Sequence, residues 1–193
     1  MLFNNQDEIN RSLEGIASLD NGDLIIIDAE KLRMNIIDQL VLNAAVNPFP
    51  NLKGFSRYVL KSVALELGIV PSSIQGLYEA RGRGEVKGFT VPALNIRGLP
   101  YELCRAIFRT ALKTEAGAFI FELAKSEMGY TFQKPQELSA VILGAAIKEG
   151  YKGPVFIQGD HFQVNAKNYV KNKEKEIAGL KKLIEDGIAG TFY

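Results

Sequence analysis

The sequence has very few of the residues from which metal sites and nucleophilic sites are usually built. Its 193 residues include one histidine, His161, one cysteine, Cys104, and no tryptophan. A zinc site with three histidines, or one that combines several histidines and cysteines, therefore cannot be built from this chain alone. A Ser-His-Asp triad stays arithmetically possible, but no G-x-S-x-G motif accompanies it. The single cysteine cannot form an internal disulfide, which fits a reducing cytosol.

An excess of charge of one sign and long apolar runs are also missing. Lysine plus arginine number 23 and aspartate plus glutamate 22, so the formal net charge is +1. Without surplus positive charge, nucleic acid and acidic membranes are poor candidates as partners. No signal-peptide pattern is visible, and every apolar run is far shorter than the roughly 20 residues of a membrane helix. We expect a cytoplasmic globular protein with one domain, or one domain plus an appendage.

Residues 1–87 are expected to form a helical N-terminal extension. The predicted helices, which carry apolar side chains at helical spacing, are 29–46, 55–67 and about 72–80. Pro48 and Gly68 stand where the first two helices should end. A short strand over residues 24–27, which are apolar and β-branched, is the alternative for that segment.

From residue 88 onward, short apolar runs alternate with helical stretches. The runs expected to be strands are 89–96, 118–123 and 154–158, and the helices expected after them are 100–113, 135–149 and 174–189. Alternation at this spacing predicts βαβ units with parallel strands, hence an α/β fold. Because the strands are almost continuously apolar, both faces of the sheet should be covered. The run 171–182, rich in Lys and Glu, should be a solvated helix face.

The last residues, Phe192 and Tyr193, have the character of the start of a fourth strand. We expect from this that the chain is cut inside a strand, and that the third or fourth strand leaves an unpaired edge. A complete three-stranded α/β domain is the alternative.

Asp160 and His161 directly follow the third predicted strand, where ligands bind in parallel α/β folds. The imidazole of His161 could ligate a metal, and Asp160 could act as a general acid or base. The alternative assigns His161 to a hydrogen-bonded loop and Asp160 to the cap of the next helix.

Further polar residues follow the first and second predicted strands. Asn95 could bind a hydroxyl or a phosphate and Arg97 an anion, although both could equally cap and solvate their loop. The polar residues after the second strand are Lys125, Ser126 and Glu127. Glu122 lies within an otherwise apolar strand, so we expect it to need a partner, either Lys125 or Arg97.

The stretch from Gly76 to Tyr193 resembles the class II, metal-dependent ketose-bisphosphate aldolases. The segments FTVPALNIRG, GAFIFELAKSEMGYT and GPVFIQGDHFQVN carry the resemblance, and their Asp-His pair is its most specific feature. The resemblance implies a TIM (β/α)8 barrel over residues 88–193, truncated to about three βα units and the start of a fourth strand. Residues 1–87 would pack against the barrel or a partner subunit.

The resemblance also implies a reaction, the reversible aldol cleavage of fructose or tagatose 1,6-bisphosphate to dihydroxyacetone phosphate and glyceraldehyde 3-phosphate. Carried over to this chain, Asp160 is the acid/base, His161 is a ligand of Zn²⁺ or another divalent metal, and Asn95 and Ser126 bind substrate. The other two histidine ligands come later in the family's chains, so this chain should be inactive alone. Many members carry a serine where Glu122-Leu123-Ala124 stands here.

The resemblance further implies a role in glycolysis or related carbohydrate metabolism and a homo-oligomeric parent protein, a dimer or a tetramer. Two other functions stay open. One is another barrel lyase or isomerase acting on phosphosugars. The other is a non-catalytic α/β scaffold in which Asp160 and His161 are structural.

Overall fold

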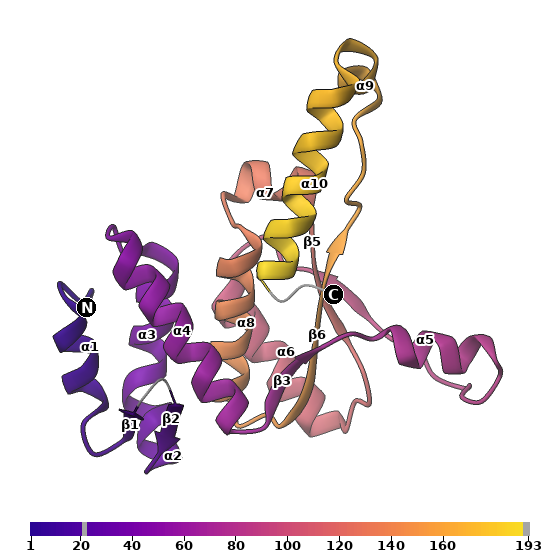
Figure 1. Cartoon of the computed structure of the whole chain (residues 1–193). Coiled ribbons are helices and arrows are strands. Elements are labelled where there is room, and N and C mark those ends of the chain that lie inside the picture. Colours follow the sequence, from indigo (N-terminus) through magenta and orange to yellow (C-terminus); the bar gives the residue numbers. More distant parts are fainter. Residues whose placement is uncertain (21–22, 191–193) are drawn as a thin grey trace. The chain divides into compact units, whose positions relative to one another are not determined.

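The computed structural model describes residues 1–20 and 23–190, arranged in two compact units (Figure 1). The first unit comprises Met1–Val70, Leu99–Ala116 and Glu137–Pro154, and the second comprises Pro71–Gly98, Gly117–Gln136 and Val155–Tyr193. Both units therefore draw on residues from either side of position 87. Phe192 and Tyr193, the expected start of a fourth strand, lie outside the described residues.

The first unit is mainly helical. Its elements are α1 (Gln6–Leu13), β1 (Ala17–Asp20), β2 (Asp23–Ile26), α2 (Ala29–Lys31), the π-helix η1 (Leu32–Ile36), α3 (Ile37–Val46), α4 (Pro50–Glu66), α6 (Pro100–Thr114) and most of α8 (Pro135–Lys148). The helix predicted over 29–46 is confirmed, with a π-helical turn in its middle. Its first turn is capped by Asp28, whose side chain accepts a hydrogen bond from the Lys31 N–H at 3.0 Å.

The expectation of an entirely helical segment 1–87 is wrong at three strands. β1 and β2 pair as an antiparallel hairpin, with Ala17 opposite Ile26 and Leu19 opposite Leu24. The alternative of a short strand near 24–27 is therefore confirmed. Leu24 is buried and Ile25 is exposed, which is the alternation of a strand with one covered face. The sequence hides this pattern because the exposed positions are isoleucines as well.

Close helix packing forms the core of the first unit. Gly144 of α8 lies so near α3 and α4 that a Cβ there would be 2.2 Å from Val41 Cγ2 and 3.5 Å from Leu60 Cδ2. The side chains of Ile37, Leu40 and Leu60 are fully buried. Glycine at this position removes the one side chain that would hold the helices apart.

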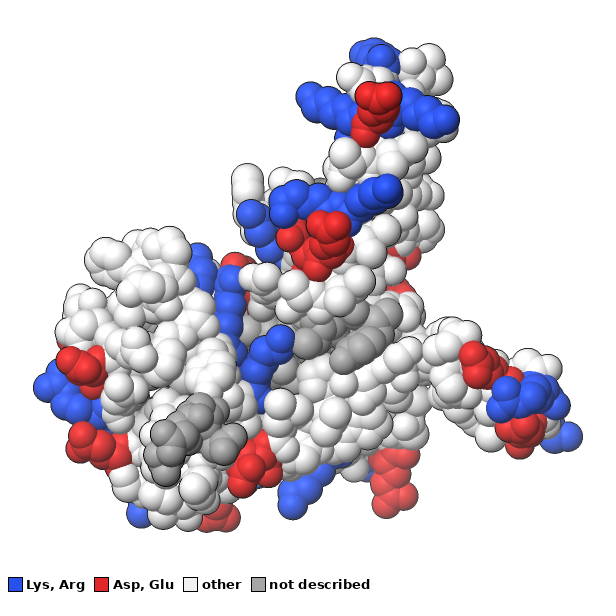
Figure 2. Space-filling model, viewed as in Figure 1, with Lys and Arg blue, Asp and Glu red and all other residues white. Residues whose placement is uncertain are grey.

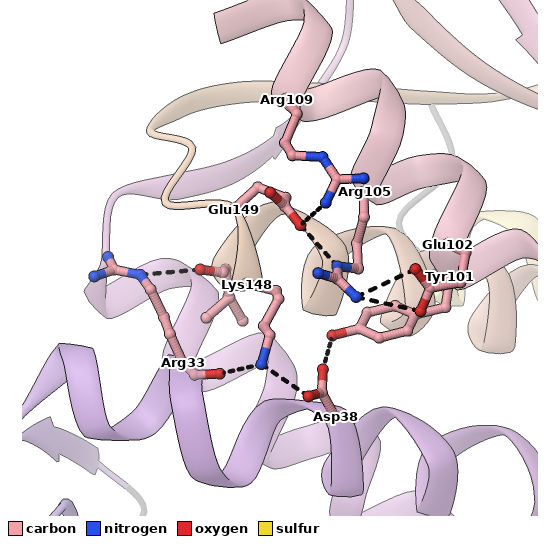
Figure 3. A network of polar contacts seen from close by, with 9 residues as sticks. Arg33, Asp38, Tyr101, Glu102, Arg105, Arg109, Lys148 and Glu149 are labelled. Carbon is pink, nitrogen blue, oxygen red and sulfur yellow. Dashed lines mark hydrogen bonds and ion pairs between the residues drawn. The ribbon is translucent and has the colours of Figure 1, made fainter.

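A polar network at the C-terminal end of α8 reinforces this packing (Figure 3). The Asp38 carboxylate accepts hydrogen bonds from the Tyr101 hydroxyl at 2.7 Å and from Lys148 Nζ at 2.8 Å. Burial raises the pKa of Asp38, but these two donors outweigh it and leave the pKa below its usual value. Arg33 Nε donates to the Ile147 carbonyl at 3.0 Å, which satisfies a carbonyl in the last turn of the helix.

The second unit contains parallel strands together with helices. Its elements are α5 (Gln75–Gly82), β4 (Ala93–Asn95), β5 (Ile120–Ala124), α7 (Lys125–Thr131), α9 (Ala166–Lys171), α10 (Lys173–Ala189) and most of β6 (Gly153–Asp160). The pairs β4–β5 and β5–β6 are parallel, which confirms the predicted βαβ organisation and the α/β class. The first strand is shorter than predicted since Pro92 has no N–H to donate to a ladder.

The sheet has a fourth strand that the sequence did not predict. β3 (Ile69–Ser72) lies beside β6, so the strand order is β3-β6-β5-β4. The Gly153 N–H donates to the Gly68 carbonyl at 2.8 Å where the two strands begin. Part of the β6 edge that was expected to stay unpaired is therefore paired with β3, which has four residues against the eight of β6. A strand of four residues that contains Pro71 carries too weak a pattern to be recognised.

The predicted helix over 174–189 is α10, which is longer than expected and separated from α9 by Asn172. The Asn172 side chain accepts a hydrogen bond from the Lys175 N–H at 2.9 Å and so caps α10. Most side chains of the run 171–182 are exposed, as predicted, and Figure 2 shows charges of both signs together on these helices. None of the helices in the described ranges is long and apolar enough to cross a membrane.

We predict that Gly144→Ala lowers the free energy of unfolding by about 1–3 kcal/mol, because the added methyl overlaps the Val41 side chain. Gly54→Ala in α4 is the matched control, since a Cβ there meets nothing within 4 Å. That control should stabilise the protein by roughly 0.5–1 kcal/mol through helix propensity. Urea unfolding followed by circular dichroism measures both changes, and equal effects of the two substitutions would contradict the packing described.

Candidate functional site

The parallel register aligns polar side chains at the carboxyl ends of β4, β5 and β6. Asn95 is opposite Glu122, Glu122 is opposite Gln158, and Ala124 is opposite Asp160. Side chains two residues apart on a strand share a face, so Asn95, Glu122, Gln158 and Asp160 all lie on one face of the sheet. This is the end of the sheet where the sequence predicted a site.

Asn95 and Asp160 meet across the intervening strand. Asn95 Nδ2 donates a hydrogen bond to Asp160 Oδ2 at 3.0 Å, although β5 lies between β4 and β6. Neighbouring strands are about 4.8 Å apart, so the two side chains have roughly twice that distance to span. They can do so because the residue opposite Asp160 is Ala124, which has no side chain beyond Cβ. The structure thus joins two of the predicted site residues.

Glu127, in the first turn of α7, organises this contact. Its side chain is 5% exposed, and it accepts hydrogen bonds from the Ala124 N–H at 2.9 Å, from Asn95 Nδ2 at 3.0 Å and from Arg97 Nε. Burial raises the pKa of the Glu127 carboxyl, but these three donors together outweigh it and leave the pKa below its usual value. Glu127 is therefore a buried, ionised carboxylate.

Glu127 was predicted only as a polar residue after the second strand, with no role of its own. The signal that could have found it is its position three residues after Ala124, the residue that precedes α7. A glutamate three residues into a helix start often accepts the N–H of the capping residue. That local bond accounts for one donor, whereas the bonds from Asn95 and Arg97 depend on how β4 lies beside β5.

Asp160 and His161 are adjacent in the structure as well as in sequence. His161 Nδ1 contacts Asp160 Oδ1, and the two side chains are 71% and 24% exposed, respectively. His161 has φ +52°, a left-handed conformation that costs a residue with a side chain about 1 kcal/mol or more. The alternative role of Asp160 as a helix cap is wrong, because Asn165 caps α9 by accepting from the Asn168 N–H at 3.1 Å.

The partner of Glu122 differs from the expected one. Gln158 Nε2, directly opposite on β6, donates to Glu122 Oε1. Arg97 is instead the partner of Glu127, and Lys125 Nζ pairs with Glu176 at 2.8 Å. The prediction of Lys125 or Arg97 was wrong because it considered only cationic side chains at the strand ends, whereas the register places an uncharged donor, Gln158, directly opposite Glu122.

Ser126 is exposed and lies on the wall of a cavity of about 400 Å³ in the second unit. His161 lines the same cavity, and so do Lys125, Gln163, Asn165 and Glu176. Asn95 and Asp160 are not among its lining residues. The four predicted site residues therefore form two adjoining pairs, Asn95 with Asp160 and Ser126 with His161, connected through the contact between Asp160 and His161.

The residues present do not form a complete zinc site. Within residues 1–20 and 23–190, no group of three or more His, Cys, Asp or Glu side chains is placed to hold a metal ion. His161 offers one exposed imidazole, whose Nδ1 already faces Asp160. The carboxylate of Glu127 is engaged by three N–H donors. Cys104 belongs to the other unit, where burial raises the pKa of its thiol and keeps it protonated.

All three segments that resemble class II aldolases contribute to this site. The first supplies Asn95, the second supplies Ser126 and Glu127, and the third supplies Asp160 and His161. Comparisons with known protein families, with curated proteins and with solved structures found no match to this chain. The aldolase assignment is thus a proposal that depends on these segments and on the geometry of the site.

We predict that Glu127→Gln lowers the free energy of unfolding at pH 7 by about 1–3 kcal/mol, since it replaces a charged acceptor that holds three donors. The carboxyl pKa is lower in the folded than in the unfolded state, so this stability is present above the unfolded pKa of about 4.3. It is lost as the pH falls through the folded pKa.

Urea unfolding at pH 7, 5 and 3 tests this. The difference between wild type and Glu127→Gln should be the same at pH 7 and 5 and smaller at pH 3. Glu79→Gln, which changes a 55% exposed side chain on α5, should alter stability by less than about 0.5 kcal/mol. A difference that grows toward acid would show that Glu127 is not the stabilising carboxylate inferred here.

Proposed function

We propose that the second unit carries the proton-transfer part of the active site of an aldol lyase that acts on a phosphorylated ketose. The observation that carries this proposal is the placement of Asp160 at the carboxyl end of β6, partly exposed, beside His161 and with its carboxylate bonded to Asn95. A partly exposed carboxylate at this edge, fixed by a neutral amide, suits repeated uptake and release of a proton.

The proposed reaction assigns Asp160 one proton. In the cleavage direction, Asp160 accepts the proton of the substrate hydroxyl whose oxygen becomes the aldehyde, while the neighbouring carbon–carbon bond breaks. The electrons of that bond remain on the ketone-derived fragment as an enediolate, which takes up a proton from water, while Asp160 releases the proton it accepted to water and is regenerated. In the synthetic direction, Asp160 returns its proton to the aldehyde oxygen. The bond from Asn95 holds Asp160 Oδ2, so the orientation of the carboxylate is fixed before substrate arrives.

In this proposal, Asn95 and Ser126 bind the substrate. Ser126 contributes a hydroxyl to a cavity of about 400 Å³, a volume that suits a small phosphorylated sugar. Lys125 adds a cationic side chain to the same cavity, although Glu176 neutralises much of its charge. The choice between fructose and tagatose bisphosphate depends on contacts that these residues do not define.

The resemblance implies a divalent metal ion, of which His161 would be one ligand. The described residues supply no second and third ligand, so the proposal assigns His161 one coordination position and nothing more. On the same resemblance, we propose a cytoplasmic, homo-oligomeric enzyme of carbohydrate metabolism.

We further propose that β4, β5 and β6 are the first three strands of a TIM barrel. Consecutive parallel strands are neighbours in such a barrel, and β4, β5 and β6 have this order. A fourth barrel strand would lie beside β6, on the edge that β3 occupies. Because β3 has four residues and β6 has eight, β3 covers at most half of that edge.

A non-catalytic scaffold is the second candidate function. It is favoured by one observation, that every carboxylate of the site has a hydrogen-bond or ion-pair partner within the chain. A purely structural network would also satisfy its charges in this way. Measurement of activity separates the two functions.

We predict that the 193-residue chain alone does not cleave fructose or tagatose 1,6-bisphosphate, because its described residues lack further metal ligands. The full-length parent protein that the resemblance implies, supplied with Zn²⁺, should cleave one of them, and Asp160→Asn should lower its kcat by roughly 10²–10⁴-fold. Release of dihydroxyacetone phosphate, coupled to oxidation of NADH, measures the rate. Asp186→Asn is the matched control, because Asp186 lies on α10 and pairs only with Lys182 in the described chain. Full activity of Asp160→Asn would refute the role of Asp160, and cleavage of neither sugar by the wild-type parent protein would refute the lyase.

His161→Ala tests the metal assignment separately. Bound zinc in that parent protein, measured by mass spectrometry after gel filtration, should fall at least about tenfold in His161→Ala and stay unchanged in Asp186→Asn. Because the His161 side chain is 71% exposed, its removal should change the unfolding free energy by less than roughly 0.5 kcal/mol. Equal zinc content in wild type and His161→Ala would exclude His161 as a ligand.

A further inference from the structure

The side-chain amide of Asn95 lies between two carboxylates. Its Nδ2 is 3.0 Å from Glu127 Oε2 and 3.0 Å from Asp160 Oδ2, and the two hydrogens of an amide nitrogen suffice for both bonds. The flipped amide would place its oxygen against the ionised carboxylate of Glu127, which cannot donate a hydrogen bond. Asn95 can therefore adopt only one of its two orientations, which leaves its oxygen outside these bonds as a free acceptor.

Glu127 is the rigid member of this arrangement. Its side chain is 5% exposed and it accepts from the Ala124 backbone and from Arg97 as well as from Asn95, whereas the Asp160 side chain is 24% exposed. These donors keep its pKa low, so Glu127 offers Asn95 only acceptor atoms. A glutamine at position 127 could donate from its own amide and would permit the flipped Asn95.

We propose that Glu127 is a positioning residue for the proton transfer. It fixes the Asn95 amide so that one N–H orients Asp160 Oδ2, while the Asn95 oxygen accepts a hydrogen bond from a hydroxyl of the substrate. The site then favours ligands that present a hydroxyl donor at this point over analogues that present only an acceptor. The part of this inference that concerns substrate rests on the proposed function, and the orientation of Asn95 does not.

Hydrogen exchange of the Asn95 side-chain amide, followed by ¹H–¹⁵N NMR of the full chain without metal or substrate, tests the orientation. Glu127→Gln should speed the exchange of at least one Asn95 amide proton by roughly tenfold or more, because it removes a bond to a charged acceptor. Glu79→Gln should leave both protons unchanged. Unchanged Asn95 exchange in folded Glu127→Gln overturns the inference.

Arg97→Ala keeps the test decisive if Glu127→Gln does not fold. The Arg97 side chain is 60% exposed, so its loss should leave the fold intact while it removes one of the donors that hold Glu127. The Asn95 amide protons should then exchange a few-fold faster than in the wild type. Exchange equal to that of the wild type again overturns the inference.

Steady-state kinetics of the full-length parent protein tests the consequence for catalysis. Glu127→Gln should lower kcat about tenfold or more at full zinc occupancy, with a smaller change in KM, since the misplaced group is the one that moves the proton. Faster amide exchange with unchanged kcat overturns the positioning role. If the wild-type parent protein cleaves neither sugar, the proposed function is wrong, and the exchange measurement alone then decides whether Glu127 orients Asn95.

Discussion

A charge that a fold removes from water must be surrounded by donors, and the carboxylate of Glu127 imposes this requirement on its surroundings. One donor is local, because α7 begins directly after β5 and leaves the Ala124 N–H without a helical partner. The other two donors are Asn95, the last residue of β4, and Arg97, which follows in the loop. β4 therefore has to end where both side chains reach the same carboxylate. Satisfying Glu127 thus fixes how the end of β4 meets the start of α7.

The same constraint bears on the orientation of the Asp160 carboxylate. Asn95 can reach Asp160 across β5 because Ala124 offers no side chain beyond Cβ between them, and the same amide nitrogen donates to Glu127. His161 follows in a left-handed conformation, on the exposed side of the pair. Backbone strain of this kind lowers stability and is found preferentially at functional sites. The orientation of the carboxylate in the proposed proton transfer and the exposure of the imidazole therefore depend on the same local structure.

The sequence predicts those features that depend on neighbours along the chain. Proline at the start of α6 and glycine after α10 mark helix ends, and the apolar runs before Asn95 and Asp160 mark strand ends, so the edge that carries the site could be predicted. Features that depend on contacts across the sheet could not. The bond between Asn95 and Glu127 requires the β4–β5 register, and Gln158 partners Glu122 only through the β5–β6 register. β3, with four residues of which one is proline, is too short to show its place beside β6.

The position of β3 matters for whether the sheet can continue as a barrel, but not for the hydrogen bonds at the proposed site. The hydrogen bonds among Asn95, Glu127 and Asp160 involve only β4, β6 and the first turn of α7, with β5 as the spacer between the strands. β3 contacts the opposite margin of β6, where Gly153 meets Gly68 at the start of the strand, seven residues before Asp160. Replacing β3 by another strand on that edge would therefore leave the donors around Glu127 and the orientation of Asp160 in place. The site is a local property of three parallel strands and one helix start, whichever strand closes the edge of β6.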